Sequence, residues 1–194
     1  MKIAVYCSAK DRIPAEYLAL GDELGTWLGA AGHTLVYGGA TGGLMTRVSN
    51  AAKQAGACVE GVIPQRIIQA KRMADNCDRL YMVPNMSARK QLMRTMADCF
   101  VCLPGSYGTM DEMMDVVASG TVDEHRKSIF VLNYKGFYEG LKQQSEHMRK
   151  LGFLPPVEQY APQFVDTMDE LKENLTNLEL RILNKKQYAK DQSF

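Results

Sequence analysis

Short runs of apolar residues recur along the chain and alternate with longer segments of helical periodicity. Six runs have the length and composition of buried strands, and they cover residues 2–7, 34–38, 58–63, 79–83, 98–103 and 128–133. Between and after them, apolar residues spaced three and four apart predict amphipathic helices over 17–31, 44–55, 86–97, 110–119, 137–150 and 168–183. The chain therefore reads as repeated strand-helix units.

This alternation predicts an α/β fold. Strands that are apolar on both faces belong in a parallel sheet with helices on each side and right-handed crossovers. We expect a Rossmann-like, doubly wound sheet of seven or nearly seven strands. A single domain over residues 1–184 accounts for the chain, and the polar residues 185–194 are expected to form a frayed tail.

Composition narrows the class of partner. The 194 residues are 46% hydrophobic, and 23 Lys and Arg against 22 Asp and Glu leave a net charge of +1 without a basic block. We therefore expect a small-molecule partner and no nucleic-acid partner. No apolar run approaches the roughly 20 residues that span a bilayer, and charge comes early in "MKIAVYCSAKD". We expect a cytoplasmic protein that does not bind membranes.

The five cysteines are an odd number and favour free thiols in a reducing compartment. The spacing of Cys99 and Cys102 is typical of a metal or redox pair. In a strand, however, residues three apart point to opposite faces of the sheet, so these thiols should not share a ligand. We expect ordinary buried cysteines and no metal site.

Two strand-to-helix turns are rich in glycine, "VYGGATGGLM" at 36–45 and "LPGSYGTMDE" at 103–112. Ligands of doubly wound sheets bind where strands end and helices begin, and such turns let backbone amides approach phosphate. Neither turn has the dinucleotide-binding spacing or the P-loop lysine, which argues against ordinary NAD or ATP binding. Glycines that only permit tight turns are the alternative. A phosphate site requires 38–43 and 105–109 to converge at one sheet edge.

Glu112 stands three residues after Thr109, where a helix is expected to begin. On that helix it lies about 60° from Thr109, and helical side chains lean toward the amino end, so its carboxylate should tip toward the turn. An acidic residue in a first helical turn also complements the helix dipole without any further function. Geometry alone leaves both interpretations open.

Arg89 lies within an apolar arc of its predicted helix, among Leu92, Met93 and Met96. A cation there must meet an anion, reach solvent or pair across a subunit contact, because burying an unpaired charge is costly. Lys90 lies at the edge of the arc and could assist. A structural ion pair or a snorkelling side chain is the alternative.

These segments resemble a known family. "YGGATGGLM", "MSARKQLM" and "LPGSYGTMDE" have the order and spacing of LOG-type proteins. The members are cytokinin riboside 5'-monophosphate phosphoribohydrolases, many of them labelled possible lysine decarboxylases. The similarity extends from "IAVYCSA" to the helix after "FVLNYKGFY".

The resemblance implies hydrolysis of the N-glycosidic bond of a nucleoside 5'-monophosphate, such as AMP or an N6-modified AMP, by a homodimer without a cofactor. Arg89 and Glu112 match the catalytic pair, and a cation near Glu112 should favour its ionised form. The substrate-binding positions implied by the resemblance are Ser8, Gly42, Gly43, Met86, Lys90, Gly105, Ser106, Tyr107, Gly108 and Thr109.

Three departures from the family pattern bear on base preference. Ser106 replaces the second glycine of Pro-Gly-Gly, Ser87 and Ala88 replace the segment with the usual histidine, and Arg66 stands where many members have an acidic residue. The alternative function is a carrier that holds a nucleotide or phosphorylated cofactor without cleaving it. A pyridoxal-dependent decarboxylase is disfavoured, because no Schiff-base lysine with a pyridinium partner is recognisable.

Overall fold

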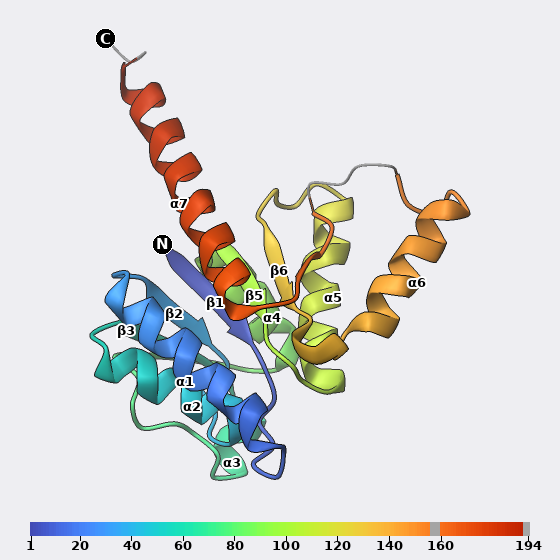
Figure 1. The fold of residues 1–194 in the computed structure, drawn as a ribbon. Coiled ribbons are helices and arrows are strands. Elements are labelled where there is room, and N and C mark those ends of the chain that lie inside the picture. Colours follow the sequence, from blue (N-terminus) through green and yellow to red (C-terminus); the bar gives the residue numbers. More distant parts are fainter. Residues whose placement is uncertain (156–159, 192–194) are drawn as a thin grey trace.

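Seven parallel strands form the sheet of the computed structural model, which describes residues 1–155 and 160–191 (Figure 1). The strands run in the order β4-β3-β2-β1-β5-β6-β7, and every neighbouring pair is parallel. Their bounds are β1 Lys2–Tyr6, β2 Thr34–Tyr37, β3 Cys58–Pro64, β4 Arg79–Val83, β5 Cys99–Cys102, β6 Ile129–Leu132 and β7 Gln163–Val165. The predicted doubly wound fold is confirmed.

The chain reverses its winding direction between β1 and β5. It proceeds from β1 outward to β4, returns to β5 on the other side of β1, and continues outward to β7. In sheets of this kind the loops after the two central strands diverge and leave a crevice for ligand. The loops after β1 and β5 are therefore the first place to look for a site.

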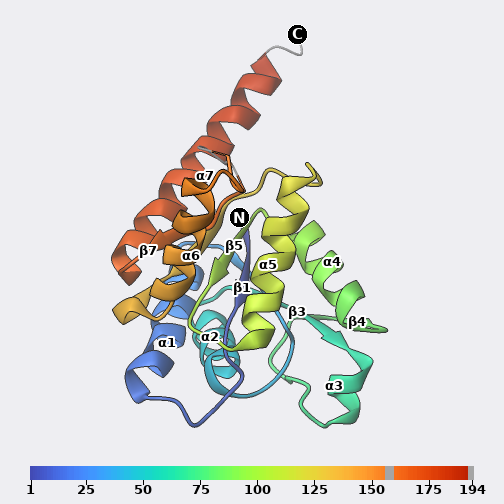
Figure 2. The same ribbon diagram turned by 90° about the vertical axis from the view of Figure 1, so that its right-hand side faces the viewer.

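Helices cover both faces of the sheet (Figures 1 and 2). Residues of α1, α2 and α7 share one core, and residues of α4 and α5, with Tyr138 and Leu141 beside them, share the other. The bounds are α1 Ala15–Ala30, α2 Gly43–Gln54, α3 Gln65–Gln69, α4 Met86–Met96, α5 Tyr107–Thr121, the 3-10 helix η1 Tyr134–Gly136, α6 Glu139–Lys150 and α7 Met168–Asp191.

The alternation within β5 separates its two cysteines. Cys99 belongs to the core under α1, α2 and α7, whereas Cys102 belongs to the core under α4 and α5. The prediction that they face opposite sides is confirmed, and all five cysteines are free. Among the described residues, no helix is long and apolar enough to span a membrane.

Several boundaries differ from the expected ones. β7 and α3 were not predicted, and α5 begins at Tyr107 rather than near Thr109. The helix expected over 168–183 was too short, because α7 continues to Asp191 and so includes most of the segment expected to fray. Figure 2 shows its last turns extending away from the sheet. Residues 192–194 lie outside the described part.

Candidate active site

The two glycine turns meet on either side of the loop after β1. The backbone of Ser8 joins them, because its N–H donates to Pro104 O (3.3 Å) and its carbonyl accepts from Met45 N–H (3.3 Å). The buried Ser8 hydroxyl accepts from Lys10 N–H at 3.1 Å. Ser8 thus lies at the centre of the predicted site, and the expectation that the turns converge at the carboxyl edge is confirmed.

The turn before α5 is shaped around Thr109, which is buried. A Cβ at Gly105 would lie 2.1 Å from Thr109 Oγ1, so only glycine leaves room for the threonine to fold over the turn. A Cβ at Gly108 would meet nothing within 4 Å. Tyr107 is 89% exposed, and Ser106, the N-cap residue, makes no side-chain capping hydrogen bond.

The first amides of α5 are therefore available to an anion. The first four N–H groups of a helix have no partner within it and carry the positive end of its dipole. At α4 this need is met by a side chain, because Asn85 Oδ1 accepts from Ala88 N–H at 2.9 Å. At α5 no side chain of the described chain caps that end.

The turn before α2 is arranged differently, because its amides already have partners. Gly42 N–H donates to Thr46 Oγ1 at 2.7 Å, and Gly43 N–H donates to Asp11 Oδ1 at 2.7 Å. Asp11 places its own carboxylate at the amino end of α2. Phosphate contact with Gly42 and Gly43 stays a prediction, and it would require these bonds to be exchanged.

A polar cavity of about 510 Å³ adjoins this second turn, and Lys10 and Arg72 contribute cations to its wall. Arg72 lies between α3 and β4. Its Nη2 donates to Thr41 O at 2.9 Å, in the loop after β2, and to Ala9 O at 3.3 Å, in the loop after β1, so it connects these two loops. Neither Arg72 nor Asp11 was among the predicted site residues. Asp11 was visible only as the first acidic residue after the first strand.

Arg89 and Glu112 form a buried ion pair. Arg89 is 5% exposed and Glu112 3% exposed, and Arg89 Nη2 donates to Glu112 Oε1. Arg89 Nη1 lies 3.8 Å from Met86 Sδ, while its Nε is buried without a hydrogen-bond partner among the described residues. Of the three outcomes expected for an arginine in this apolar arc, an anion, solvent or a subunit contact, the structure shows the first, and a purely structural ion pair would look the same.

Burial decides the protonation tendency of Glu112. Desolvation raises the pKa of its carboxyl above the ordinary value, and the nearby Arg89 lowers that pKa only in part. The expectation that a nearby cation favours the ionised form is confirmed for the effect of Arg89, but burial has the larger effect and the net shift of the pKa is upward. A carboxyl of this kind can exchange a proton nearer neutral pH than an exposed glutamate.

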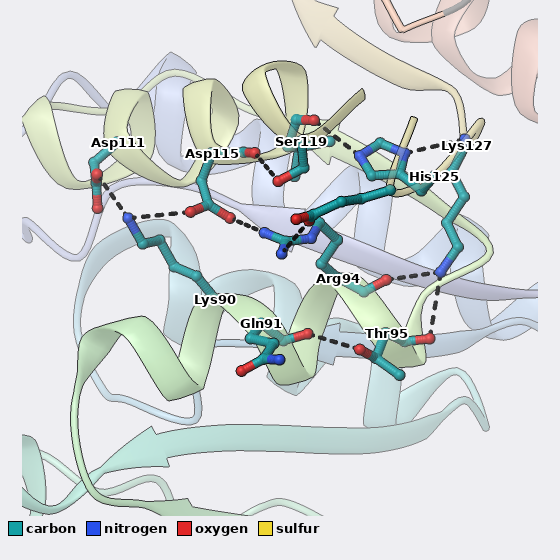
Figure 3. Close-up of polar contacts among 11 residues, drawn as sticks. Lys90, Gln91, Arg94, Thr95, Asp111, Asp115, Ser119, His125 and Lys127 are labelled. Atoms are coloured by element: carbon teal, nitrogen blue, oxygen red, sulfur yellow. Dashed lines mark hydrogen bonds and ion pairs between the residues drawn. The ribbon is translucent and has the colours of Figure 1, made fainter. Parts of the chain in front are cut away.

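Ion pairs fasten α4 to α5 beside this pair (Figure 3). Lys90 Nζ lies 2.9 Å from Asp111 Oδ1 and 3.4 Å from Asp115 Oδ1, and Arg94 reaches Asp115 from the other side. The bond to Asp111, partly opposed by desolvation, raises the pKa of Lys90. These contacts fix the distance between the helices that carry Arg89 and Glu112. Lys90 as a substrate-binding residue stays a prediction.

Two further cavities differ in their relation to the site. One of about 280 Å³ adjoins Ser8, Gly105 and Ser106 and has Tyr17 and Phe137 in its apolar wall. Another of about 680 Å³ lies at the amino ends of β5, β6 and β7, on the opposite sheet edge. Basic residues line the second, but Arg126 is paired with Asp123, and Lys127 Nζ donates to the carbonyls of Arg94 and Thr95.

No group of three or more His, Cys, Asp or Glu side chains within residues 1–155 and 160–191 is arranged to hold a metal ion.

Of the other predicted positions, Met86 begins α4 and is 40% exposed, close to Arg89. The predicted residues thus gather at one edge of the sheet, around the buried pair.

Comparison with known proteins gives consistent relatives. The sequence pattern of a family described as "Possible lysine decarboxylase" matches residues 45–175. A protein of Mycobacterium marinum named cytokinin riboside 5'-monophosphate phosphoribohydrolase is 35% identical over 168 residues, which are 87% of this chain and 89% of that protein. The protein of the same name from Mycobacterium tuberculosis is 32% identical over 89% of this chain and 90% of its own length.

Solved structures share the fold at lower identity. The molybdenum cofactor carrier protein of Chlamydomonas reinhardtii aligns with a TM-score of 0.69 at 18% identity, over 92% of this chain and 98% of that one. The molybdenum cofactor binding protein of Rippkaea orientalis aligns with a TM-score of 0.67 at 19% identity, over 94% and 96% of the two chains. At such identity the likeness shows the fold alone.

Proposed function

Because the chain belongs to the LOG family, the family described as possible lysine decarboxylases, we propose that it is a nucleoside 5'-monophosphate phosphoribohydrolase. Water adds to C1' of the ribose, the bond between C1' and the base nitrogen breaks, and the base leaves with a proton. The products are the free base and ribose 5-phosphate. Relatives named for this activity at 32–35% identity over most of the chain support the proposal.

One observation carries the proposal, namely the buried pair of Arg89 and Glu112 beside the uncapped amino end of α5. Glycosidic cleavage passes through an oxocarbenium-like state, which a nearby carboxylate stabilises or supplies with an activated water. Glu112 is the carboxylate in this position, and α5 carries both it and the amides for phosphate. The unpartnered Nε of Arg89 supplies a donor for the ribose or the departing base.

The substrate is AMP or an N6-modified AMP, as in the cytokinin riboside 5'-monophosphate of the relatives' name. Ser106, Ser87 and Arg66 bear on which base is preferred. A panel of nucleoside 5'-monophosphates, with the corresponding nucleosides as controls, tests the proposal by chromatography of the released base. We expect release from at least one monophosphate and at least about tenfold less from its nucleoside, because the α5 amides then have no phosphate to bind. Release from none of the monophosphates would contradict the proposal.

A carrier of a nucleotide or phosphorylated cofactor is the second candidate, since the two proteins named for carrying or binding molybdenum cofactor show that this fold also serves carriers. A carrier has little need of a buried carboxylate paired with an arginine. Incubation with AMP separates the two functions, because a carrier binds the nucleotide and leaves it intact.

A cytoplasmic homodimer is the assembly and location that we propose. Free cysteines support a reducing compartment. Exposed apolar side chains on and beside α4 and α5 support a partner there, among them Met82 at 73% and Tyr107 at 89% exposure. Light scattering at micromolar concentration should give twice the mass of the 21.6 kDa chain, and a monomer mass would reject the dimer.

A further inference from the structure

Gly38 follows β2 directly, and its backbone conformation does not require a glycine. The neighbouring Gly39, Gly42 and Gly43 have positive φ angles, which favour glycine, whereas Gly38 is not among the residues with positive φ. What separates Gly38 from an alanine is the space beside it. A Cβ there would lie 2.4 Å from Arg89 Nη2 and 3.0 Å from Arg89 Cζ.

We infer that Gly38 is a positioning residue, whose missing side chain leaves the space through which the Arg89 guanidinium reaches Glu112. The third neighbour of the added Cβ is Met45 Cε at 3.3 Å, also the end of a flexible side chain. An alanine at 38 therefore meets no backbone atom among its nearest neighbours. In Gly38→Ala we therefore expect the Arg89 guanidinium to be displaced and the fold to remain intact.

The guanidinium has little room in which to move without leaving Glu112. Arg89 is 5% exposed, and its Nη1 already lies against Met86 Sδ at 3.8 Å. Nη2 is both the atom that a Cβ at 38 would strike and the atom that donates to Glu112 Oε1. Displacing it separates the two charges and leaves a buried carboxylate with less compensation.

Loss of this contact has a signature in the titration of Glu112. Burial raises the pKa of Glu112 and Arg89 lowers it, so moving the guanidinium away raises that pKa further. The other titratable or charged groups that act on Glu112, or on which it acts, are Lys90 of α4, Asp111 and Asp115 of α5, Tyr6 and Cys7 at the end of β1, and Cys102 of β5. None of them is among the three nearest neighbours of the added Cβ.

The test compares Gly38→Ala with Gly140→Ala, in which the added Cβ on α6 meets nothing within 4 Å. As far as turnover is concerned, the inference rests on the proposed hydrolase function. We expect kcat for AMP to fall by about tenfold or more in Gly38→Ala, with a smaller change in KM. The acidic limb of the kcat profile should move to higher pH by about one unit, since an adjacent cation lowers a carboxyl pKa by about that much or more. Gly140→Ala should behave as wild type. A Gly38→Ala variant whose kcat and pH profile match those of wild type and of Gly140→Ala would overturn the inference.

A double-mutant cycle covers the case in which Gly38→Ala folds poorly. Arg89→Lys removes Nη2 and Cζ, so Gly38→Ala should then cause little further loss of thermal stability or turnover. The same loss of melting temperature in both backgrounds would place the clash elsewhere and overturn the inference. If wild type hydrolyses no monophosphate, the proposed function is wrong, but the inference about Gly38 is still open to test. A crystal structure of Gly38→Ala still decides, because an intact contact between Arg89 and Glu112 contradicts positioning and a broken one supports it.

Discussion

The amino ends of α2 and α5 look alike in sequence and differ in structure. Both follow a glycine-rich turn after a strand that neighbours β1, β2 for α2 and β5 for α5, and Ser8 is hydrogen-bonded to α2 and to the turn before α5. At α2, the carboxylate of Asp11 and the hydroxyl of Thr46 occupy the amides of Gly43 and Gly42. At α5, no described side chain caps the helix. A glycine turn before a helix is thus a potential anion site, and the neighbouring side chains decide whether the protein itself fills it.

The two ends also differ in what lies behind them. α5 carries Glu112 in its second turn, next to Arg89, so a phosphate bound at its amino end would bring the ribose toward the buried pair. α2 carries no acidic residue anywhere along its length. The turn before α2 contributes Gly38 instead, whose missing side chain leaves space for the Arg89 guanidinium. We therefore assign phosphate binding and chemistry to α5 and support to α2.

Glu112→Gln is the change with the largest expected effect. It removes the negative charge and nearly preserves the shape of the side chain, so base release from AMP should fall by about two orders of magnitude or more. AMP binding, followed by calorimetry, should survive. Glu146→Gln is the matched control, because it makes the same exchange at an exposed glutamate of α6. Hydrolysis by Glu112→Gln at the wild-type rate would mean that the carboxylate only complements the helix dipole.

Thr109→Ala and Thr41→Ala compare a threonine of each turn. Thr109 is buried over the α5 turn, and its loss should raise KM for AMP by about tenfold, the size expected for one hydrogen bond to a charged group, with a smaller effect on kcat. Thr41 Oγ1 is bonded only weakly, to Arg72 O at 3.4 Å, in the other turn. Steady-state kinetics should show KM unchanged within about twofold for Thr41→Ala. The reverse ranking would assign phosphate to the α2 turn.

Asp11→Asn has the smallest expected effect. The amide oxygen can still accept from Gly43 N–H, so the loss of charge at the amino end of α2 should lower the free energy of unfolding by about 0.3–1 kcal/mol in denaturant titrations. Affinity for AMP should change by no more than about threefold if the phosphate binds at α5, as we propose. AMP binding that tightens by about tenfold would instead show that Asp11 competes with phosphate.

Patterns along the chain predict the elements with an apolar run or a regular apolar period, and these include β4 and α6, in which no residue is buried. Every residue of β5 and β6 is buried, and both strands were predicted. β7 has 3 residues and α3 has 5, which is too short for an apolar run or a helical period to be detected. The last turns of α7 are polar and lie beyond the sheet, and nothing in their pattern distinguishes a helix from a frayed tail.

The candidate site was predictable where a residue conflicted with its surroundings. Arg89 in an apolar arc indicated a buried partner, and Glu112 in the next motif supplied one. The net direction of the pKa shift at Glu112 was not predictable, because it depends on the depth of burial of the carboxyl as well as on Arg89. The bond between Asp11 and Gly43 joins residues 32 positions apart, and no local pattern reports such a contact.

A crystal structure of Glu112→Gln with AMP tests the assignment of the two turns most directly, because this variant should bind the nucleotide and leave it intact. We predict that the phosphate lies within hydrogen-bonding distance of the amides of Tyr107, Gly108 and Thr109, with the ribose toward Arg89 and with Asp11 still bonded to Gly43. A phosphate seated on Gly42 and Gly43, with Asp11 displaced, would contradict the assignment.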